Sequence, residues 1–353
     1  MISLQDCIIT KYDNGSFSYN RYIHPSMVNL IEEFKKRYSN FPVIFPSGVC
    51  AIDSSIQCLM IENEWKPVHL IYGSELYCDS PRAFKYLEKM FPSLVKLYKV
   101  DITDDEKIKN QVKECSLTSD RIFFYFETCS NPNGHIINFE ILQELKNITS
   151  NMRIIVDNTW ITSTIFNPFQ FDEIDIVVNS LTKYYGGGNS GILGVSISKT
   201  EEFGNILFDY ARIKGLHVSP IYCDAVVENM KKMDSIIRYS SDLTLDVVKK
   251  LREKNIEVIY PKLEDHSSYT KANKYFGDLG PSVFTFIIPE KRESALKIMR
   301  NSKYDCSTSF GCSTSRFDQW PISKKKRSIC RFSVGHDDNL DNIVNEFYRM
   351  LLL

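Results

Sequence analysis

The amino-acid sequence predicts an α/β fold, in which a mostly parallel central sheet is covered by helices and is followed by a smaller C-terminal α+β domain. Three observations predict this fold. The chain has 353 residues, which is enough for two domains. Short runs rich in β-branched and aromatic residues alternate with amphipathic segments through its middle. After about residue 215 this alternation gives way to a long helical region.

Five apolar runs are the predicted strands of the central sheet, and they cover residues 68–74, 94–100, 121–128, 153–158 and 175–180. They are too uniformly apolar for a sheet that has one face in water. Amphipathic helices are predicted between them, for example at residues 80–91 and 138–150. Because strand–helix alternation is typical of parallel sheets, we expect a ligand beyond the carboxyl ends of these strands.

The sequence predicts three parts of the chain. Residues 1–40 are expected to form an N-terminal arm and a helix without a core of their own, residues 41–230 the large domain, and residues 231–353 the small domain. The predicted elements beyond the large sheet are a long helix near 220–254, strands at 257–261, 283–289 and 330–335, a helix at 294–300, and a C-terminal helix.

Composition excludes several classes of function. The net charge is −1, so the sequence shows no electrostatic footprint for nucleic acid or an anionic membrane. No run approaches the roughly 20 apolar residues of a membrane span, and the first residues lack the pattern of a signal peptide. Ten cysteines without CxxC pairs favour reduced thiols in the cytoplasm, and no His or Cys set has the spacing of a metal site.

Two candidate site segments lie before the first predicted strand and after the third. Ser47, Gly48 and Val49 directly precede an apolar helical pattern, and a helix start exposes backbone N–H groups that suit a phosphate. Taken alone, this segment is more simply a plain N-cap. Asn131 follows the strand at residues 121–128, in a segment that by its Asn, Pro and Gly content is otherwise a turn.

The next two strands end in groups that carry charge. Asp157 ends the strand at residues 153–158, and a carboxylate at a buried edge is costly without a cationic partner. Lys183 follows the strand at residues 175–180 and is flanked by Ser180 and Thr182. An amine in such a place is suited to covalent work once it is desolvated, although a lone lysine there is more simply a surface residue.

Together these groups supply what pyridoxal 5′-phosphate (PLP) needs. That cofactor requires a Schiff-base lysine and an acidic partner for its ring nitrogen. We therefore predict that Lys183 holds the cofactor, that Asp157 pairs with the ring nitrogen, and that the helix start at Ser47 binds the phosphate.

Eight sequence motifs, in family order, resemble those of the Cys/Met-metabolism PLP enzymes of fold type I, which include cystathionine γ-synthase, cystathionine lyase and methionine γ-lyase. The matching stretches are YNRYIHPS (19–26), SGVCAI (47–52), YCDSPRAF (77–84), ETCSNP (127–132), VDNT (156–159), SLTKY (180–184), SFG (309–311) and RFSVG (331–335). The resemblance implies the fold-type-I PLP-dependent transferase architecture, with PLP bound by the large domain.

The resemblance also implies roles for particular residues. Tyr77 would stack on the cofactor ring and share the catalytic work with Lys183, while Ser309 and Arg331 would bind the substrate, with Arg331 on its α-carboxylate. Tyr19 and Arg21 match residues that reach the cofactor phosphate of the neighbouring subunit. A homodimer with shared active sites is therefore expected, possibly assembled further into a tetramer.

The implied reaction is a β- or γ-elimination, or a γ-replacement, on a sulfur-containing or O-activated homoserine-type amino acid. Two alternatives are a specialised enzyme of the same family, acting on an amino acid with a polar or cationic distal group, and a non-catalytic protein with this fold. An aminotransferase of the same fold is a further rival, which the SLTKY and RFSVG contexts disfavour.

Three departures from the family pattern concern the substrate. Thr308 stands where relatives have Glu or Tyr, Asp79 stands two residues past Tyr77 where relatives have Gly or Cys, and residues 312–326 are shorter and differently charged. We predict that Asp79 and Thr308 line the distal part of the substrate pocket. The alternative for Asp79 is a structural ion pair with Arg82.

Overall fold

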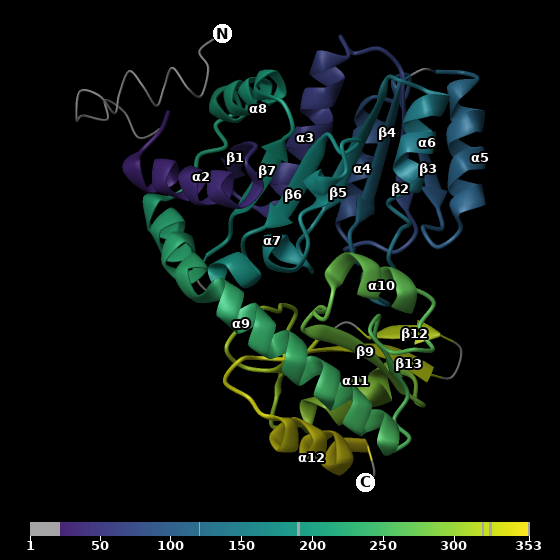
Figure 1. Cartoon of the computed structure of the whole chain (residues 1–353), viewed down its shortest axis with the longest axis vertical. Coiled ribbons are helices and arrows are strands. Elements are labelled where there is room, and N and C mark those ends of the chain that lie inside the picture. The colour runs from purple at the N-terminus through teal and green to yellow at the C-terminus, as the bar shows by residue number, and fades with distance from the viewer. Residues whose placement is uncertain (1–21, 120, 189–190, 320, 325–326, 352–353) are drawn as a thin grey trace.

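The computed structural model describes residues 22–119, 121–188, 191–319, 321–324 and 327–351. Two sheets organise them, a large one in the upper part of the molecule and a smaller one in the lower part (Figure 1). The long helix α9, Pro220–Glu253, runs beside both. No helix of these described residues is long and apolar enough to cross a membrane.

The upper sheet has seven strands in the order β1-β7-β6-β5-β4-β2-β3. Its strands are β1 (Phe41–Phe45), β2 (Val68–Gly73), β3 (Val95–Val100), β4 (Ile122–Glu127), β5 (Met152–Asp157), β6 (Ile176–Ser180) and β7 (Gly194–Ser198). Strands β2 to β6 pair in parallel, whereas β7 is antiparallel to both of its neighbours. The predicted α/β class with a mostly parallel sheet is therefore confirmed.

Helices cover this sheet on both faces (Figure 1). They are α2 (Pro25–Tyr38), α3 (Gly48–Glu62), α4 (Ser80–Met90), α5 (Asp105–Ser116), α6 (Ile141–Ile148), α7 (Thr162–Ile165) and α8 (Glu201–Ile213), with short 3₁₀ turns η1 (Pro168–Gln170) and η2 (Tyr184–Gly186). Helix α3 packs on β6 and β7, and α2 packs on β1 and α9. The start of α3 is thereby fixed beside the end of β6.

One predicted strand differs from the expectation of uniform burial. Strand β3 is buried only at its two ends, Val95 and Val100, while its middle residues are partly or fully exposed. The reason is its place at the edge of the sheet, where only β2 pairs with it. Strands β1 and β7, which complete the opposite side, were not predicted from the sequence.

The lower sheet belongs to the C-terminal part. Its strands are β8 (Val258–Ile259), β9 (Val283–Ile288), β10 (Asp305–Cys306), β11 (Arg316–Phe317), β12 (Ile322–Lys324) and β13 (Arg327–Ser333), and its helices are α10 (Tyr269–Phe276), α11 (Arg292–Arg300) and α12 (Leu340–Leu351). Strand β13 pairs antiparallel with β9, β11 and β12.

Two apolar clusters form the cores of these parts. The larger includes residues of α9 up to Ile237, and the smaller begins on the same helix at Leu243. The boundary between residues 230 and 231 thus falls within a continuous helix. The division into domains at 41–230 and 231–353 remains a prediction.

The carboxyl ends of the central strands bring polar groups together. Glu127 of β4 pairs in register with Asp157 of β5, and Asp157 pairs with Val178 of β6, two residues before Ser180. These ends face the same edge of the sheet because the strands are parallel.

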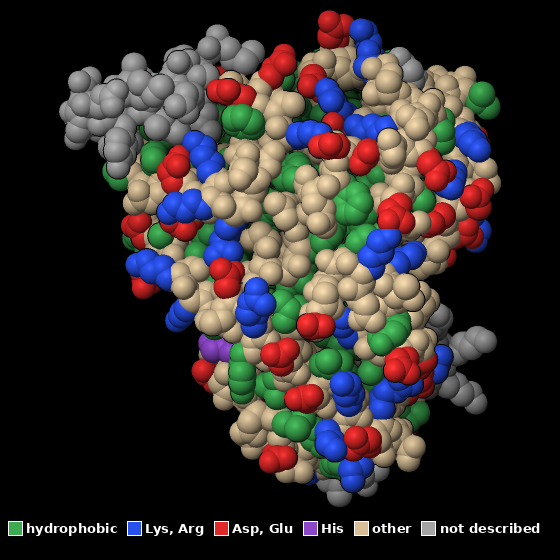
Figure 2. Space-filling view, in the orientation of Figure 1, with side chains coloured by type: hydrophobic (Ala, Val, Ile, Leu, Met, Phe, Trp, Pro, Cys, Tyr) green, Lys and Arg blue, Asp and Glu red, His purple; other side chains and the backbone are tan. Residues whose placement is uncertain are grey.

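Charges of both signs are interspersed on the molecular face shown in Figure 2.

A close backbone approach fixes the turn before α3. A Cβ added to Gly194 of β7 would lie 2.2 Å from the carbonyl oxygen of Ser47 and 2.7 Å from the amide nitrogen of Gly48. Backbone atoms cannot move aside as a flexible side chain can. Glycine at position 194 therefore holds the start of α3 against the sheet.

We expect Gly194→Ala to lower the free energy of unfolding by about 1–3 kcal/mol, as overpacked sites do. It should also increase amide hydrogen exchange in the first turn of α3, because the added methyl displaces residues 47 and 48. Urea denaturation and exchange mass spectrometry measure both. Gly277→Ala is the control: its site has a positive φ of 60° but nothing within 4 Å, so it should lower stability and leave α3 protected. If amide hydrogen exchange in α3 were the same in Gly194→Ala as in the wild type, Gly194 would not be what holds the start of this helix against the sheet.

Candidate active site

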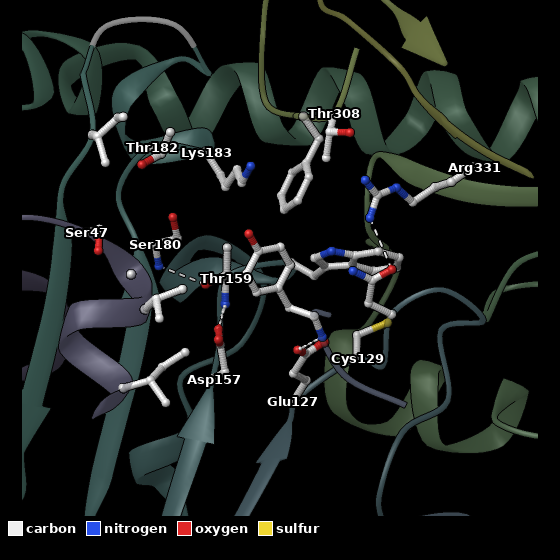
Figure 3. Close-up of a pocket in the computed structure, with 18 residues that line it drawn as sticks. Ser47, Glu127, Cys129, Asp157, Thr159, Ser180, Thr182, Lys183, Thr308 and Arg331 are labelled. Atoms are coloured by element: carbon white, nitrogen blue, oxygen red, sulfur yellow. Dashed lines mark hydrogen bonds between the residues drawn. The ribbon is translucent and has the colours of Figure 1, made fainter. Parts of the chain in front are cut away.

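A cavity of about 230 Å³ lies at the carboxyl edge of the upper sheet, against residues of the lower part. Figure 3 shows Asp157 and Glu127 on the ends of neighbouring strands, with Lys183 and Arg331 on the opposite side of the cavity. The residues that line it are Ser47, Gly48, Val49, Ile52, Tyr77, Glu127, Cys129, Asn131, Asp157, Thr159, Trp160, Ser180, Thr182, Lys183, Ile192, Thr308, Phe310 and Arg331.

The start of α3 forms one wall of this cavity. The hydroxyl of Ser47 accepts a hydrogen bond from the amide of Cys50 at 3.1 Å, so Ser47 is indeed an N-cap. A Cβ on Gly48 would lie 2.7 Å from Cβ of Ser180. The hydroxyl-bearing residues Ser180 and Thr182 line the same wall. Backbone N–H groups, a helix dipole and hydroxyls together suit a phosphate.

Asp157 is buried at the end of β5. Its Oδ1 accepts a hydrogen bond from the amide of Thr159 at 2.9 Å, and its Oδ2 accepts one from the hydroxyl of Tyr125 at 3.1 Å. Burial raises the pKa of this carboxyl, and these hydrogen bonds oppose the rise. Among the described residues no cationic side chain forms an ion pair with it, so the carboxylate is suited to a cation inside the cavity.

Glu127 lies beside it on β4. Its Oε1 accepts a hydrogen bond from the amide of Tyr77 at 2.6 Å, which fixes the loop that carries Tyr77. Burial, and then the neighbouring charge of Asp157, raise the pKa of Glu127 well above its usual value. Two carboxylates buried side by side therefore disfavour being ionised at the same time.

Lys183 follows β6 at the start of the turn η2. Its Nζ donates to the hydroxyl of Ser309 at 3.4 Å and lies 5.1 Å from the ring centre of Phe310. Burial, together with the nearby charge of Arg331, lowers the pKa of Lys183 to about 8. The neutral, nucleophilic form of this amine is therefore far more populated near neutral pH than in an ordinary lysine, although it is still the minor form.

Arg331 enters from β13 of the lower sheet. Its Nη1 donates to Oδ1 of Asn131 at 3.1 Å, and its Nη2 forms an ion pair with Asp318. Its guanidinium lies 5.9 Å from the ring centre of Trp160 and 6.0 Å from that of Phe310. A planar cation held in this way is suited to binding a carboxylate.

Tyr77 lines the cavity, and Asp79 does not. The Tyr77 hydroxyl donates to Oδ2 of Asp79 at 3.0 Å, while Oδ1 of Asp79 accepts from Arg82 at 2.9 Å. The Asp79 side chain thus forms the ion pair with Arg82 that was given as the alternative to lining the substrate pocket. Burial and the hydrogen bond to Asp79 raise the pKa of Tyr77 to about 12, so this phenol is protonated at neutral pH.

The structure brings together most of the site residues singled out in the sequence. Those that line the cavity are Ser47, Gly48, Val49, Tyr77, Asn131, Asp157, Ser180, Thr182, Lys183, Thr308 and Arg331. Ser309 touches Lys183 without lining the cavity. Tyr19 and Arg21 lie outside the described residues. Sequence reasoning missed the hydrogen bonds of Thr159 and the ion pair of Asp318, since neither is signalled by local spacing.

The fold and this site define a PLP-dependent enzyme of fold type I. The family described as "Cys/Met metabolism PLP-dependent enzyme" matches residues 3–343, and the chain belongs to it. PLP is therefore the cofactor, and the predicted family, enzyme class and cofactor are confirmed.

Relatives and solved structures agree with this assignment. The chain is 24% identical to cystathionine beta-lyase of Schizosaccharomyces pombe, over 85% of this chain and 74% of the relative. It is 28% identical to L-methionine gamma-lyase of Fusobacterium nucleatum, over 86% of this chain and 77% of that protein. The structure of metB from Corynebacterium glutamicum has a TM-score of 0.82 and 20% identity, covering 95% of this chain and 87% of that one, which supports the fold.

The residues present fit PLP. The glycine-dependent cradle at Ser47 and Gly48 would hold its phosphate, and the buried carboxylate of Asp157, which no described cation neutralises, would receive its ring nitrogen. The partly neutral amine of Lys183 would hold its carbonyl carbon. These three features lie on one cavity.

The lowered pKa of Lys183 has a measurable consequence for cofactor capture. In cofactor-free protein, the rate at which added PLP gains its visible absorption should follow the neutral amine and rise through pH of about 8. Arg331→Met should shift this profile to higher pH, because removing the nearby positive charge favours the ammonium form. Arg327→Met, which removes an exposed arginine paired with Glu257, is the matched control and should leave it unchanged. A wild-type midpoint near 10.5, the ordinary value, would contradict this assignment.

Proposed function

We propose that this enzyme catalyses a β- or γ-elimination, or a γ-replacement, on a sulfur-containing or O-activated homoserine-type amino acid. The observation that carries the proposal is the convergence of Lys183, Asp157 and Arg331 on one cavity. The names of the relatives, which include β-lyases, γ-lyases and a γ-synthase, support the reaction class and leave the substrate open.

When bound, PLP supplies an electron sink that stabilises negative charge at the substrate Cα. Lys183 acts as the base at that carbon. A pKa of about 8 would suit its free amine to accept the Cα proton near neutral pH. The hydrogen bond to Ser309 aims the amine across the cavity.

Arg331 and Asn131 act on the α-carboxylate, the substrate group that is attached to the reacting carbon. The guanidinium binds the α-carboxylate and is itself oriented by Oδ1 of Asn131. Fixing the carboxylate fixes the direction of the Cα–H bond, which is a proximity effect. Asp157 keeps a positive charge on the ring nitrogen by its own negative charge.

Tyr77 is the candidate proton donor to the leaving group. Its phenol is protonated at neutral pH and lines the cavity. The carboxylate of Asp79, which accepts its hydrogen bond, keeps the hydroxyl oriented until a substrate arrives. Together with Lys183 it forms the catalytic pair.

We expect the purified protein to show the visible absorption of covalently bound PLP and Lys183→Ala to lose it, together with more than about 99% of turnover, because both linkage and base are removed. Incubation with a panel of sulfur amino acids and O-acylhomoserines, followed by product mass spectrometry, identifies the substrate. Released keto acid indicates elimination, whereas a thioether formed only with added thiol indicates replacement.

Lys199→Ala is the matched control, since that surface lysine pairs with Asp172 away from the cavity. It should keep both absorption and turnover. A wild-type protein that turns over no member of the panel, although it binds PLP, would overturn the proposed substrate class.

A homodimer with shared sites is the second part of the proposal. Ile192 lines the cavity and is 60% exposed, and Tyr222 of α9, which is 43% exposed, lies against Gly191, the residue before Ile192. Exposed apolar side chains beside a binding site are typical of surfaces that another chain covers. The motif match of Tyr19 and Arg21 supports a second copy of this chain as that partner.

Arg21→Ala should weaken PLP binding by about 10- to 100-fold, the effect of losing a charged hydrogen bond. Fluorescence titration with PLP measures the affinity, and light scattering should show a dimer for both proteins. Lys85→Ala, an exposed cation on α4, is the control and should bind PLP as the wild type does. A fully active monomer would refute the shared site.

A further inference from the structure

Two departures from the family pattern meet at Arg331. The hydroxyl of Thr308 donates to Oδ1 of Asp318 at 3.0 Å, and Oδ2 of Asp318 forms an ion pair with Nη2 of Arg331. Thr308 and the segment 312–326, which contains Asp318, are two of the places at which the sequence departs from the motif pattern that it resembles. The substrate-binding arginine is thus already bound to a carboxylate of its own chain.

The backbone fixes Asp318 in this place. Strand β11 pairs antiparallel with β13, Phe317 opposite Phe332, so that Asp318 stands opposite Arg331. Its amide donates to the carbonyl oxygen of Arg331 at 2.9 Å. The side chains of Arg331 and Asp318 are only 10% and 14% exposed, so their attraction is weakly screened.

Asp318 lies at the edge of the cavity and outside its lining. Its charge acts on the amine of Lys183, inside the cavity, and on the thiol of Cys78, which is exposed. A substrate carboxylate that reaches Arg331 therefore meets a second carboxylate on the same guanidinium. Two carboxylates that share one cation repel each other.

We propose that Asp318 is a specificity-determining residue that exchanges partners when the substrate binds. The substrate carboxylate takes its place on Arg331, and the released side chain pairs with a positively charged group of the substrate. Amino acids with a cationic distal group are thereby favoured over neutral ones. The inference rests on the proposed function, because it takes Arg331 as the carboxylate site.

The partners of the other cationic side chains around Asp318 support a positively charged group of the substrate as its new partner. Arg82 is bound by Asp79, and the guanidinium of Arg316 donates to the hydroxyls of Ser307 and Thr314, each at 3.4 Å. The amine of Lys183 is committed to the cofactor. A released Asp318 that turned to Arg316 instead would give no preference for a cationic ligand, and the experiment separates the two.

Two matched probes report the exchange without reacting with the cofactor. One is 4-(trimethylammonio)butanoate, which carries a carboxylate and a fixed positive charge but no N–H group. The other is 5,5-dimethylhexanoate, which has the same shape and the same carboxylate but a carbon atom in place of the quaternary nitrogen; it is called the neutral probe because its distal end is uncharged. Isothermal titration calorimetry of the PLP-loaded enzyme with each gives two dissociation constants and needs no turnover.

The wild type should bind the cationic probe about tenfold more tightly than the neutral one, because only the cationic probe can form a close ion pair with a largely buried carboxylate. Asp318→Asn should reduce this ratio to about one and should bind the neutral probe more tightly than the wild type does, because the competing carboxylate is gone. Asp172→Asn, the same charge change at a 97% exposed site, should behave as the wild type.

Weaker binding of both probes to Asp318→Asn would overturn the exchange and leave Asp318 as a support for Arg331. An equal preference in wild type and Asp318→Asn would overturn it as well, as would an Arg331→Met variant that binds both probes unchanged. If the titrations behave as expected but no amino acid is turned over, the exchange stands and the proposed reaction fails.

Discussion

The burial of two carboxylates side by side is the constraint on which the rest of this site depends. Glu127 and Asp157 end neighbouring parallel strands in register, and both are less than 10% exposed. Two negative charges cannot both be kept there without compensation, and burial raises the pKa of each. The amide of Tyr77 and the amide of Thr159 stabilise one carboxylate each. The Asp157 carboxylate, which has no cationic partner among the described residues, would then be available to the ring nitrogen of the cofactor.

The positive groups of the site come from the opposite side and from two sheets. Lys183 leaves the upper sheet after β6, whereas Arg331 belongs to β13 of the lower one. Their contacts cross between the sheets: Lys183 reaches Ser309, and Arg331 reaches Asn131. Neither sheet holds a complete site alone. The desolvation that lowers the pKa of Lys183 thus depends on how the C-terminal part packs over the cavity.

The sequence predicted what local patterns and strand ends determine. Asp157 and Lys183 could be placed on one edge because apolar runs ended directly before them, and parallel strands share that edge. Strand β7 was not predicted, because its five residues, GVSIS, contain one glycine and two serines and are buried by β1 and β6 rather than by their own pattern. Asp318 was not predicted as a partner of Arg331 because the contact depends on the register of β11 against β13.

The same distinction explains why the cofactor is easier to predict than the substrate. The residues predicted to hold the cofactor lie on strand ends and a helix start, whose positions follow from the fold. The residues predicted to line the substrate pocket were Thr308 and Asp79, whose side-chain directions depend on the residues beside them, and of the two only Thr308 lines the cavity. Asp79 faces Arg82 and Tyr77, and Thr308 faces Asp318, so each departure from the family pattern acts through a second residue. The effect of each of these two positions therefore depends on a residue pair, and a single position examined by itself does not reveal it.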